Sequence, residues 1–184
     1  MKSKGFAIAI LFAIGLTSPI AVLAAGIQNP TIPSQDARSS ADELVQTGLQ
    51  QFRAQKFDLA IASWQQALNL YQQQKNSKGA INVLETLAEA SKMLGKYEQA
   101  IAYSQQLLAL AQSLGDRRTE ANALGNLGNN YRVVGNYAKA LEVQNRGLAI
   151  RKELNDQQGE GQVLASLGNI HYDLGNYRIA ESFF

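Results

Sequence analysis

The chain repeats itself every 40 residues from Ala41 onward. Written in rows of 41–80, 81–120, 121–160 and 161–184, it shows the same kind of residue at the same position of each row, without a gap. A fixed period of this length is typical of stacked supersecondary units rather than of a single globular core. The aligned residues are leucine at position 4 (Leu44, Leu84, Leu124, Leu164), an aromatic at position 17 (Phe57, Tyr97, Tyr137, Tyr177), alanine at position 20 (Ala60, Ala100, Ala140, Ala180) and a small residue at position 8 (Gly48, Ala88, Gly128, Gly168).

Each row predicts two helices separated by a turn. The first is expected to end at position 15, where Gly95, Gly135 and Gly175 can adopt the left-handed conformation that terminates a helix. The second is expected to run from about position 17 to about position 34. Asp116 and Asp156 then stand where a side chain can cap the next helix. The first row carries a weaker signal, with glutamine at position 15 and "KNSKG" at its end.

Glycines inside the predicted helices need an explanation, because each costs roughly 1 kcal/mol relative to alanine. The stretch from Leu124 to Glu142 holds three glycines and four asparagines, yet its apolar residues keep helical spacing. Position 8 is small in every row, which predicts that the two helices of one repeat cross closely there. Packing would then offset the loss of helix propensity at Gly128 and its equivalents.

The combination of a small residue at position 8, an aromatic at 17 and alanine at 20 resembles the tetratricopeptide repeat. The phrases "ALGNLGNNYRVVGNYAKALE" and "LASLGNIHYDLGNYRIA" carry the likeness, and they resemble the 40-residue subclass found in kinesin light chains and many cyanobacterial proteins. The usual unit has about 34 residues. The first row departs most, with Gln55 in place of glycine and Trp64 at position 24, as a terminal repeat would. The resemblance implies an all-α, right-handed superhelical solenoid of antiparallel helix pairs, with about 3.5 repeats over residues 41–184.

The resemblance also implies a binding face. In such solenoids the first helices of the repeats line the concave side, which receives extended peptides, and an asparagine can hydrogen-bond a ligand backbone through both its donor and its acceptor. Asn130 is the exception, as position 10 is expected to be partly buried. The candidate peptide-binding residues are Asn82, Glu89, Asn122, Asn126, Asn129, Arg132, Ser166, Asn169 and Tyr172.

Two interpretations of these asparagines remain open. Asparagine is unfavourable inside helices, where an exposed position usually takes Glu, Lys or Gln, so their number favours a ligand site. They could instead be ordinary solvated helix surface. If the face binds a ligand, Lys92 and Arg132 would favour a partly acidic one.

The first 25 residues have the layout of a secretory signal. Lys2 and Lys4 precede an apolar run that extends to Leu16, and small residues follow at Ala24 and Ala25. Cleavage would export the protein to the periplasm or the cell exterior, with no membrane association afterwards; an uncleaved anchor is the alternative. Residues 26–40 contain two prolines and three serines and predict a flexible linker, or else a segment packed against the first helix.

Charge and composition argue against several other functions. Loss of the signal removes two of 17 basic residues and leaves 15, equal to the number of acidic ones, so nucleic acid is not an expected partner. The chain has no cysteine and one histidine, His171, which is expected to be a packing residue, and neither a cofactor nor a metal is predicted. It contains no G-x-S-x-G, P-loop or H-E-x-x-H motif, so no enzymatic activity is expected.

The fourth row stops at Phe184, about seven residues into its second helix. Solenoids need a polar terminal cap, so Phe183 and Phe184 at an open edge suggest either self-association or a longer native chain. The prediction is thus an exported scaffold that binds a protein or peptide segment on its concave face. The alternative is the N-terminal recognition arm of a multidomain protein, for which the resemblance suggests a caspase-like CHAT protease domain.

Overall fold

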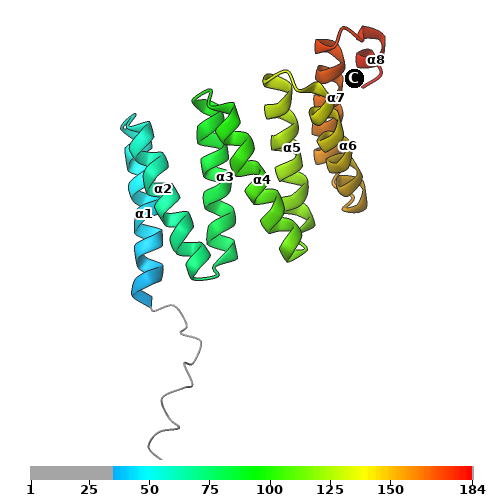
Figure 1. Ribbon diagram of the computed structural model, residues 1–184. Coiled ribbons are helices and arrows are strands. Elements are labelled where there is room, and N and C mark those ends of the chain that lie inside the picture. The colour runs from blue at the N-terminus through cyan, green and yellow to red at the C-terminus, as the bar shows by residue number, and fades with distance from the viewer. Residues whose placement is uncertain (1–34, 184) are drawn as a thin grey trace, which may run out of the picture. The chain divides into compact units, whose positions relative to one another are not determined.

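The computed structural model describes residues 35–183, which belong to one compact unit, Pro33–Phe184. This part of the chain is built from helices and turns, with no strand among the described residues (Figure 1). The helices are α1 (Gln35–Arg53), α2 (Phe57–Gln73), α3 (Ser77–Met93), α4 (Tyr97–Leu114), α5 (Arg117–Val133), α6 (Tyr137–Glu153), α7 (Gln157–Asp173) and α8 (Tyr177–Glu181).

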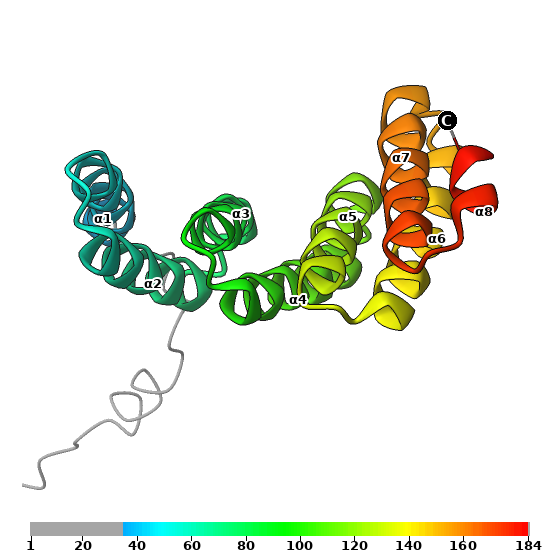
Figure 2. The same cartoon turned by 90° about the horizontal axis from the view of Figure 1, so that it is seen from above.

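Each helix packs mainly against the helix before it and the helix after it, and α5 also contacts α7. Seen from above, this unit is an arc with α1, α3, α5 and α7 along its inner side and α2, α4 and α6 along its outer side (Figure 2). The first helices of the repeats therefore line the concave face. The predicted all-α solenoid of helix pairs is confirmed for the described residues.

The helices end where the repeat predicts, through one recurring backbone geometry. Gly95 has a φ of 71°, its amide donates to the Lys92 carbonyl, and the next amide, that of Lys96, donates to the Ser91 carbonyl. This pair of hydrogen bonds is the Schellman motif. Gln55 and Lys75 adopt the same left-handed conformation, with φ of 60° and 53°, so the first repeat has the turns although it lacks the glycines.

The predicted aspartate caps are confirmed. The Asp116 carboxylate accepts a hydrogen bond from the Thr119 amide at 3.0 Å at the start of α5. Asp156 does the same for α7. Asn76 accepts from the Gly79 amide at 3.0 Å and caps α3. The segment "KNSKG", which carries the weaker signal, therefore supplies both a left-handed residue, Lys75, and a helix cap.

Glycine at position 8 makes room for one large side chain from the partner helix. A Cβ at Gly128 would lie 2.5 Å from the Gln144 side chain, and a Cβ at Gly48 would overlap the Trp64 ring. The second repeat has alanine at position 8 and serine at position 24. At the predicted close crossing, the size of the residue at position 8 is thus matched to the size of the residue at position 24. The pair of residues differs from one repeat to the next.

The same matching occurs between successive repeats, at positions 31 and 39. A Cβ at Gly79 would lie 2.5 Å from the Tyr71 ring, and a Cβ at Gly159 would overlap the Arg151 side chain. Burial and a hydrogen bond to Asp42 raise the pKa of Tyr71 to about 12. Each of these large side chains fixes the seam between one repeat and the next.

The apolar core runs along the array in two clusters. One extends from α1 through α4 to Ala123 of α5 and includes Trp64 and Leu87. The other joins α5, α6 and α7 and includes Leu127 and Ile170. Leu108 packs against both and links them. Trp64 and Tyr71 are buried, whereas Tyr97 and Tyr137 are half-buried.

The described part of the chain begins inside the predicted linker. Residues 26–40 were expected to form a tether, but α1 already starts at Gln35. Residues 26–34 and the predicted signal, 1–25, lie outside the described residues, so the signal stays a prediction.

Candidate functional site

An open polar cleft of about 330 Å³ lies on the concave face, between α3 on one side and α5 to α7 on the other. Amide and carboxylate side chains dominate its lining, which suits recognition of a polar ligand more than enclosure of an apolar one. The lining residues are Glu85, Glu89, Asn122, Gly125, Asn126, Asn129, Gln144, Arg151, Gln162, Val163 and Ser166.

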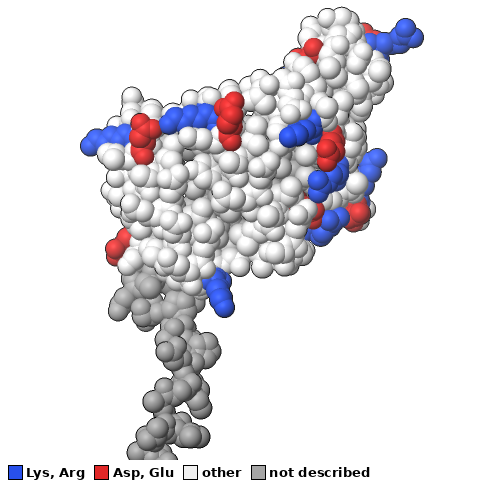
Figure 3. Space-filling model, viewed as in Figure 1, with Lys and Arg blue, Asp and Glu red and all other residues white. Residues whose placement is uncertain are grey.

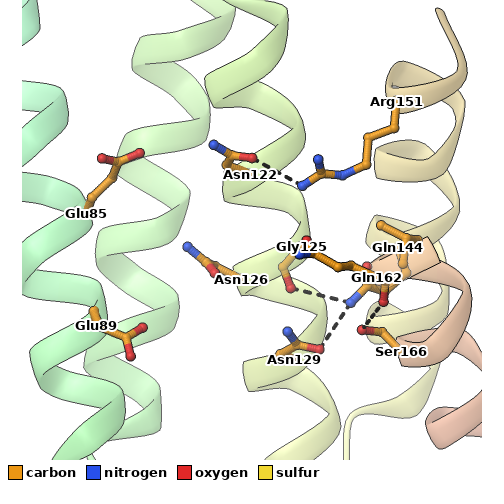
Figure 4. A pocket seen from close by; sticks show the side chains of 11 residues that line it. Glu85, Glu89, Asn122, Gly125, Asn126, Asn129, Gln144, Arg151, Gln162 and Ser166 are labelled. Carbon is orange, nitrogen blue, oxygen red and sulfur yellow. Dashed lines mark hydrogen bonds between the residues drawn. The ribbon is translucent and has the colours of Figure 1, made fainter. Parts of the chain in front are cut away.

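Helix α5 supplies a row of three amides to this cleft. Asn122, Asn126 and Asn129 are spaced by four and then three residues, which places them on one face of a helix. Figure 4 shows the side chains of Asn122 and Asn126 directed across the cleft toward Glu85 and Glu89 of α3. Asn126 is half-buried and makes no recorded hydrogen bond to another described residue. Its donor and acceptor are therefore available to a ligand backbone.

Helix α6 forms the back of the cleft with two buried polar side chains. Gln144 is 1% exposed, and its Nε2 donates to Asn129 Oδ1 at 3.3 Å and to the Gly125 carbonyl at 3.4 Å. Arg151 is 8% exposed, donates to Asn122 Oδ1 at 3.1 Å and forms an ion pair of 2.6 Å with Asp156. Both bonds hold the asparagine oxygens inward, which turns the Nδ2 donors of Asn122 and Asn129 toward the cleft.

Two buried atoms of the back wall have no hydrogen-bond partner among the described residues. They are Gln144 Oε1 and Arg151 Nε. A buried polar atom without a partner costs about 1–3 kcal/mol.

Helix α3 contributes the acidic side. Burial raises the pKa of the Glu85 carboxyl above its usual value, and the nearby negative charge of Asp116 raises it further. Glu85 takes part in no ion pair recorded for residues 35–183. Glu89 is exposed and pairs with Lys92 at 2.6 Å. Glu85 is therefore the uncompensated charge of the cleft.

The structure brings together five of the residues predicted from sequence and leaves four outside this cleft. Glu89, Asn122, Asn126, Asn129 and Ser166 line it. Ser166 donates its hydroxyl hydrogen to the Gln162 carbonyl at 3.0 Å. The residues outside it are Asn82, Arg132, Asn169 and Tyr172.

The cationic residues expected to attract an acidic ligand are compensated within the chain. Arg132 forms an ion pair of 2.6 Å with Asp173, and Lys92 is paired with Glu89. Neither lines the cleft. The structure therefore does not support the expectation of an acidic ligand.

Tyr172, another residue outside the cleft, is 62% exposed and packs edge-on against Tyr177.

Sequence reasoning missed Glu85, Gln144 and Arg151 as site residues. Nothing in the sequence distinguishes Glu85 from an ordinary solvated carboxylate on a helix. Gln144 and Arg151 lie on a second helix, which was expected to be outside the binding face. The sequence does carry a signal for both. Each is a polar residue at a position that faces a glycine of the neighbouring helix. The same two positions of the first repeat are occupied by the aromatic residues Trp64 and Tyr71.

The remaining polar residues behave as packing elements. Asn130 is 2% exposed, as expected for position 10. His171 is half-buried and stacks on the Phe183 ring with 5.7 Å between centroids. Phe183 thus packs partly within the chain, and Phe184 lies outside the described residues, so self-association through this edge stays a prediction.

Charges on the outer face do not gather by sign. Figure 3 shows the face that carries α2 and α4, where blue and red groups alternate near the edges and the middle is uncharged. Within residues 35–183 no group of three or more His, Cys, Asp or Glu side chains could hold a metal ion. None of the helices in this range is long and apolar enough to cross a membrane.

Comparison with known families identifies the repeat. The sequence pattern of the tetratricopeptide repeat matches residues 48–113 and 119–184, which together make up more than half of the chain. The chain belongs to the tetratricopeptide repeat family. None of the curated protein sequences compared with it matches. The family is generally one of non-catalytic scaffolds for interactions between proteins.

Solved structures share the fold of this chain. BtubC (BKLC) from P. vanneervenii superposes with a TM-score of 0.69 at 23% identity, covering 83% of this chain and 63% of that one. A Rap protein complexed with Competence and Sporulation Factor has a TM-score of 0.64 at 22% identity, covering 81% and 42%. The kinesin light chain nearly identical TPR-like repeats from Podosopora anserina have a TM-score of 0.65 at 13% identity, covering 78% and 71%.

These likenesses show the fold, a helical tetratricopeptide solenoid, and the predicted family is confirmed. The chain spans 63%, 42% and 39% of the lengths of the first three structures that it resembles, which are BtubC, the apo form of RapI and aspartyl phosphate phosphatase F from Bacillus subtilis.

Proposed function

We propose that this chain is an exported tetratricopeptide repeat scaffold that binds an extended segment of a partner protein along the concave cleft. The observation that carries the proposal is the amide row of Asn122, Asn126 and Asn129, which faces the cleft from one side of α5.

Amide side chains suit the binding of a peptide backbone, which offers an N–H and a carbonyl at nearly every residue. An asparagine can form a hydrogen bond with either group. Gln144 and Arg151 hold two of the three asparagines from behind. Side chains fixed in this way lose less conformational entropy when a ligand binds. The row therefore acts as a preorganised set of backbone contacts with little demand on ligand side chains.

A solved structure of similar fold shows that such a solenoid can bind a separate factor. One of the similar structures is a Rap protein in complex with a factor, the Competence and Sporulation Factor. The export part of the proposal rests on the signal layout of residues 1–25. Intact-mass measurement on protein from its native cells tests it, because cleavage after Ala24 or Ala25 removes the signal.

The binding part is tested with peptides selected from a random displayed library on the immobilised chain. Their affinities are then measured for a variant with Asn126→Ala and Asn129→Ala. Loss of two backbone hydrogen bonds is expected to weaken binding roughly tenfold or more. A matched control changes Asn69 and Asn145 to alanine, since both are exposed and lie on the outer helices α2 and α6.

Unchanged affinity in the concave-face variant, with the helical circular dichroism intact, would contradict the proposal. Equal losses in the concave-face variant and in the control would contradict it too, because they would indicate a global effect on the array.

A further inference from the structure

A second pocket adjoins the polar cleft on the concave face. It has a volume of about 360 Å³ and lies between α1, α2 and α3. Apart from three polar residues of α3, its walls are apolar. The apolar residues are Leu49, Phe52, Trp64, Ala90 and Met93.

This pocket is rigid on one side and open on the other. The Phe52 ring packs against the Phe57 ring at 5.1 Å and the Trp64 ring at 5.6 Å between centroids, which fixes the floor. Met93 at the rim is 66% exposed. An exposed methionine beside fixed aromatic rings can adapt to the shape of an entering apolar side chain.

The apolar pocket and the polar cleft share two residues, Glu85 and Glu89. A single extended ligand that reaches from one to the other must therefore pass over both carboxylates. Figure 4 shows them projecting from α3 toward α5 at the edge of the polar cleft.

The charge at this shared edge is negative. Lys92 compensates Glu89, but Glu85 is half-buried without an ion pair among the described residues, and Asp116 adds a second negative charge near it. A cation held here would be attracted at partial burial, where screening by solvent is weaker than at an exposed site. An acidic side chain would be repelled.

We infer that the partner segment pairs a bulky apolar side chain, bound in the α1–α3 pocket, with a lysine or arginine that binds Glu85. The inference rests on the proposed function and names the ligand that the concave face selects. An extended chain advances about 3.3 Å per residue and directs every second side chain to the same face, and Glu85 itself lines the apolar pocket, so the two side chains stand two or four residues apart. The rest of the segment continues along the amides of α5.

The test compares peptides selected from a random displayed library on the unmodified chain and on a variant with Glu85→Gln and Glu89→Gln. A matched control carries Glu98→Gln, an exposed carboxylate on α4. Peptides from the unmodified chain and from the control are expected to contain Lys or Arg two or four residues from a bulky apolar residue. Their affinity for the Gln variant falls roughly tenfold, and replacing the peptide's basic residue by glutamine removes that difference.

Binding of the bulky apolar side chain in the α1–α3 pocket is tested with Met93→Gln, which changes an exposed side chain and leaves the core intact. The expected result is weaker binding only for peptides that keep the bulky apolar residue, with Leu59→Gln, exposed on α2, as the control.

Each outcome decides between the two proposals. Selected peptides that lack the basic residue, or that bind the Gln variant unchanged, overturn the inference, while the proposed function stands if Asn126→Ala with Asn129→Ala still weakens them. If no peptide is enriched, or none depends on the concave asparagines, both fail.

Discussion

The Gln144 side chain occupies the space that a Cβ on Gly128 would need, with its Cδ 2.5 Å from the ideal Cβ position. The same side chain donates to Asn129 Oδ1 in the cleft. Packing within the third repeat and the shape of the candidate site therefore depend on one contact.

Gly128→Ala is expected to lower the free energy of unfolding by roughly 1–2 kcal/mol. The added methyl group displaces the buried Gln144 side chain, and this costs more than the gain in helix propensity returns. Adding Gln144→Ser should restore stability, since Ala88 and Ser104 form that pair in the second repeat. Urea unfolding measures both. Gly125→Ala is the control, because a Cβ there meets nothing within 4 Å, and it should stabilise by up to about 1 kcal/mol. Equal stability of the two single variants would contradict this account.

Lys75→Gly is expected to stabilise the protein by about 1 kcal/mol. Lys75 has a φ of 53°, a conformation that is strained for a residue with a Cβ. The matched change Lys78→Gly, three residues on and in the first turn of α3, should give no such gain in stability. Thermal unfolding of the two variants separates them. A loss of stability in both would show that the left-handed turn carries no strain.

The α5 cap gives a prediction for low pH. Hydrogen bonds from the Thr119 backbone and side chain lower the pKa of Asp116 below its usual 3.8, so its contribution to stability is present above that value and is lost as the pH falls through the lowered pKa. Asp116→Asn should keep the cap at neutral pH, as Asn76 does for α3, and should remove this acid-dependent loss.

Asp116→Ala is the companion variant. It removes the cap itself and should cost about 1 kcal/mol at neutral pH. Unfolding midpoints measured between neutral pH and pH 3 test both changes. An Asp116→Asn variant with the full acid dependence of the unmodified chain would count against the assignment.

Glu85 gives the opposite dependence of stability on pH. Its pKa is raised in the folded protein, so the ionised form is disfavoured there, and stability falls as the pH rises from the usual value of 4.5 through the raised pKa. Glu85→Gln should therefore make the free chain more stable at neutral pH and leave it nearly unchanged below pH 4. Glu98→Gln, at an exposed carboxylate on α4, is the control for the change of charge.

The period of the sequence predicted the helices, their turns and the aspartate caps, because these depend on local residues such as Gly95 and Asp116. It also predicted Asn122, Asn126 and Asn129 as neighbours, since they share one helix face. The period could not predict that Arg151, on the outer helix α6, contacts Asn122, from which it is separated by 29 residues. That contact depends on the volume left by Gly159, which only the packed array reveals.

The charges were the less predictable part of the site. Arg132 and Lys92 are cations in the sequence, but each forms an ion pair within the chain, and Arg132 reaches Asp173 across 41 residues. Glu85 showed no sequence signal, because its importance comes from partial burial beside Asp116. Local spacing predicts which face a residue occupies, whereas the compensation of its charge depends on the neighbouring repeat.

The central claim is that the concave cleft binds an extended peptide, and amide chemical-shift mapping tests it most directly. The isotope-labelled chain is titrated with a peptide selected from the random library. The account predicts shifts concentrated on the inner faces of α3, α5 and α7, at Glu85, Asn126 and Ser166, with the outer residues of α2 and α4 unchanged. Shifts confined to the outer helices, or to the exposed apolar residues near α8, would contradict it.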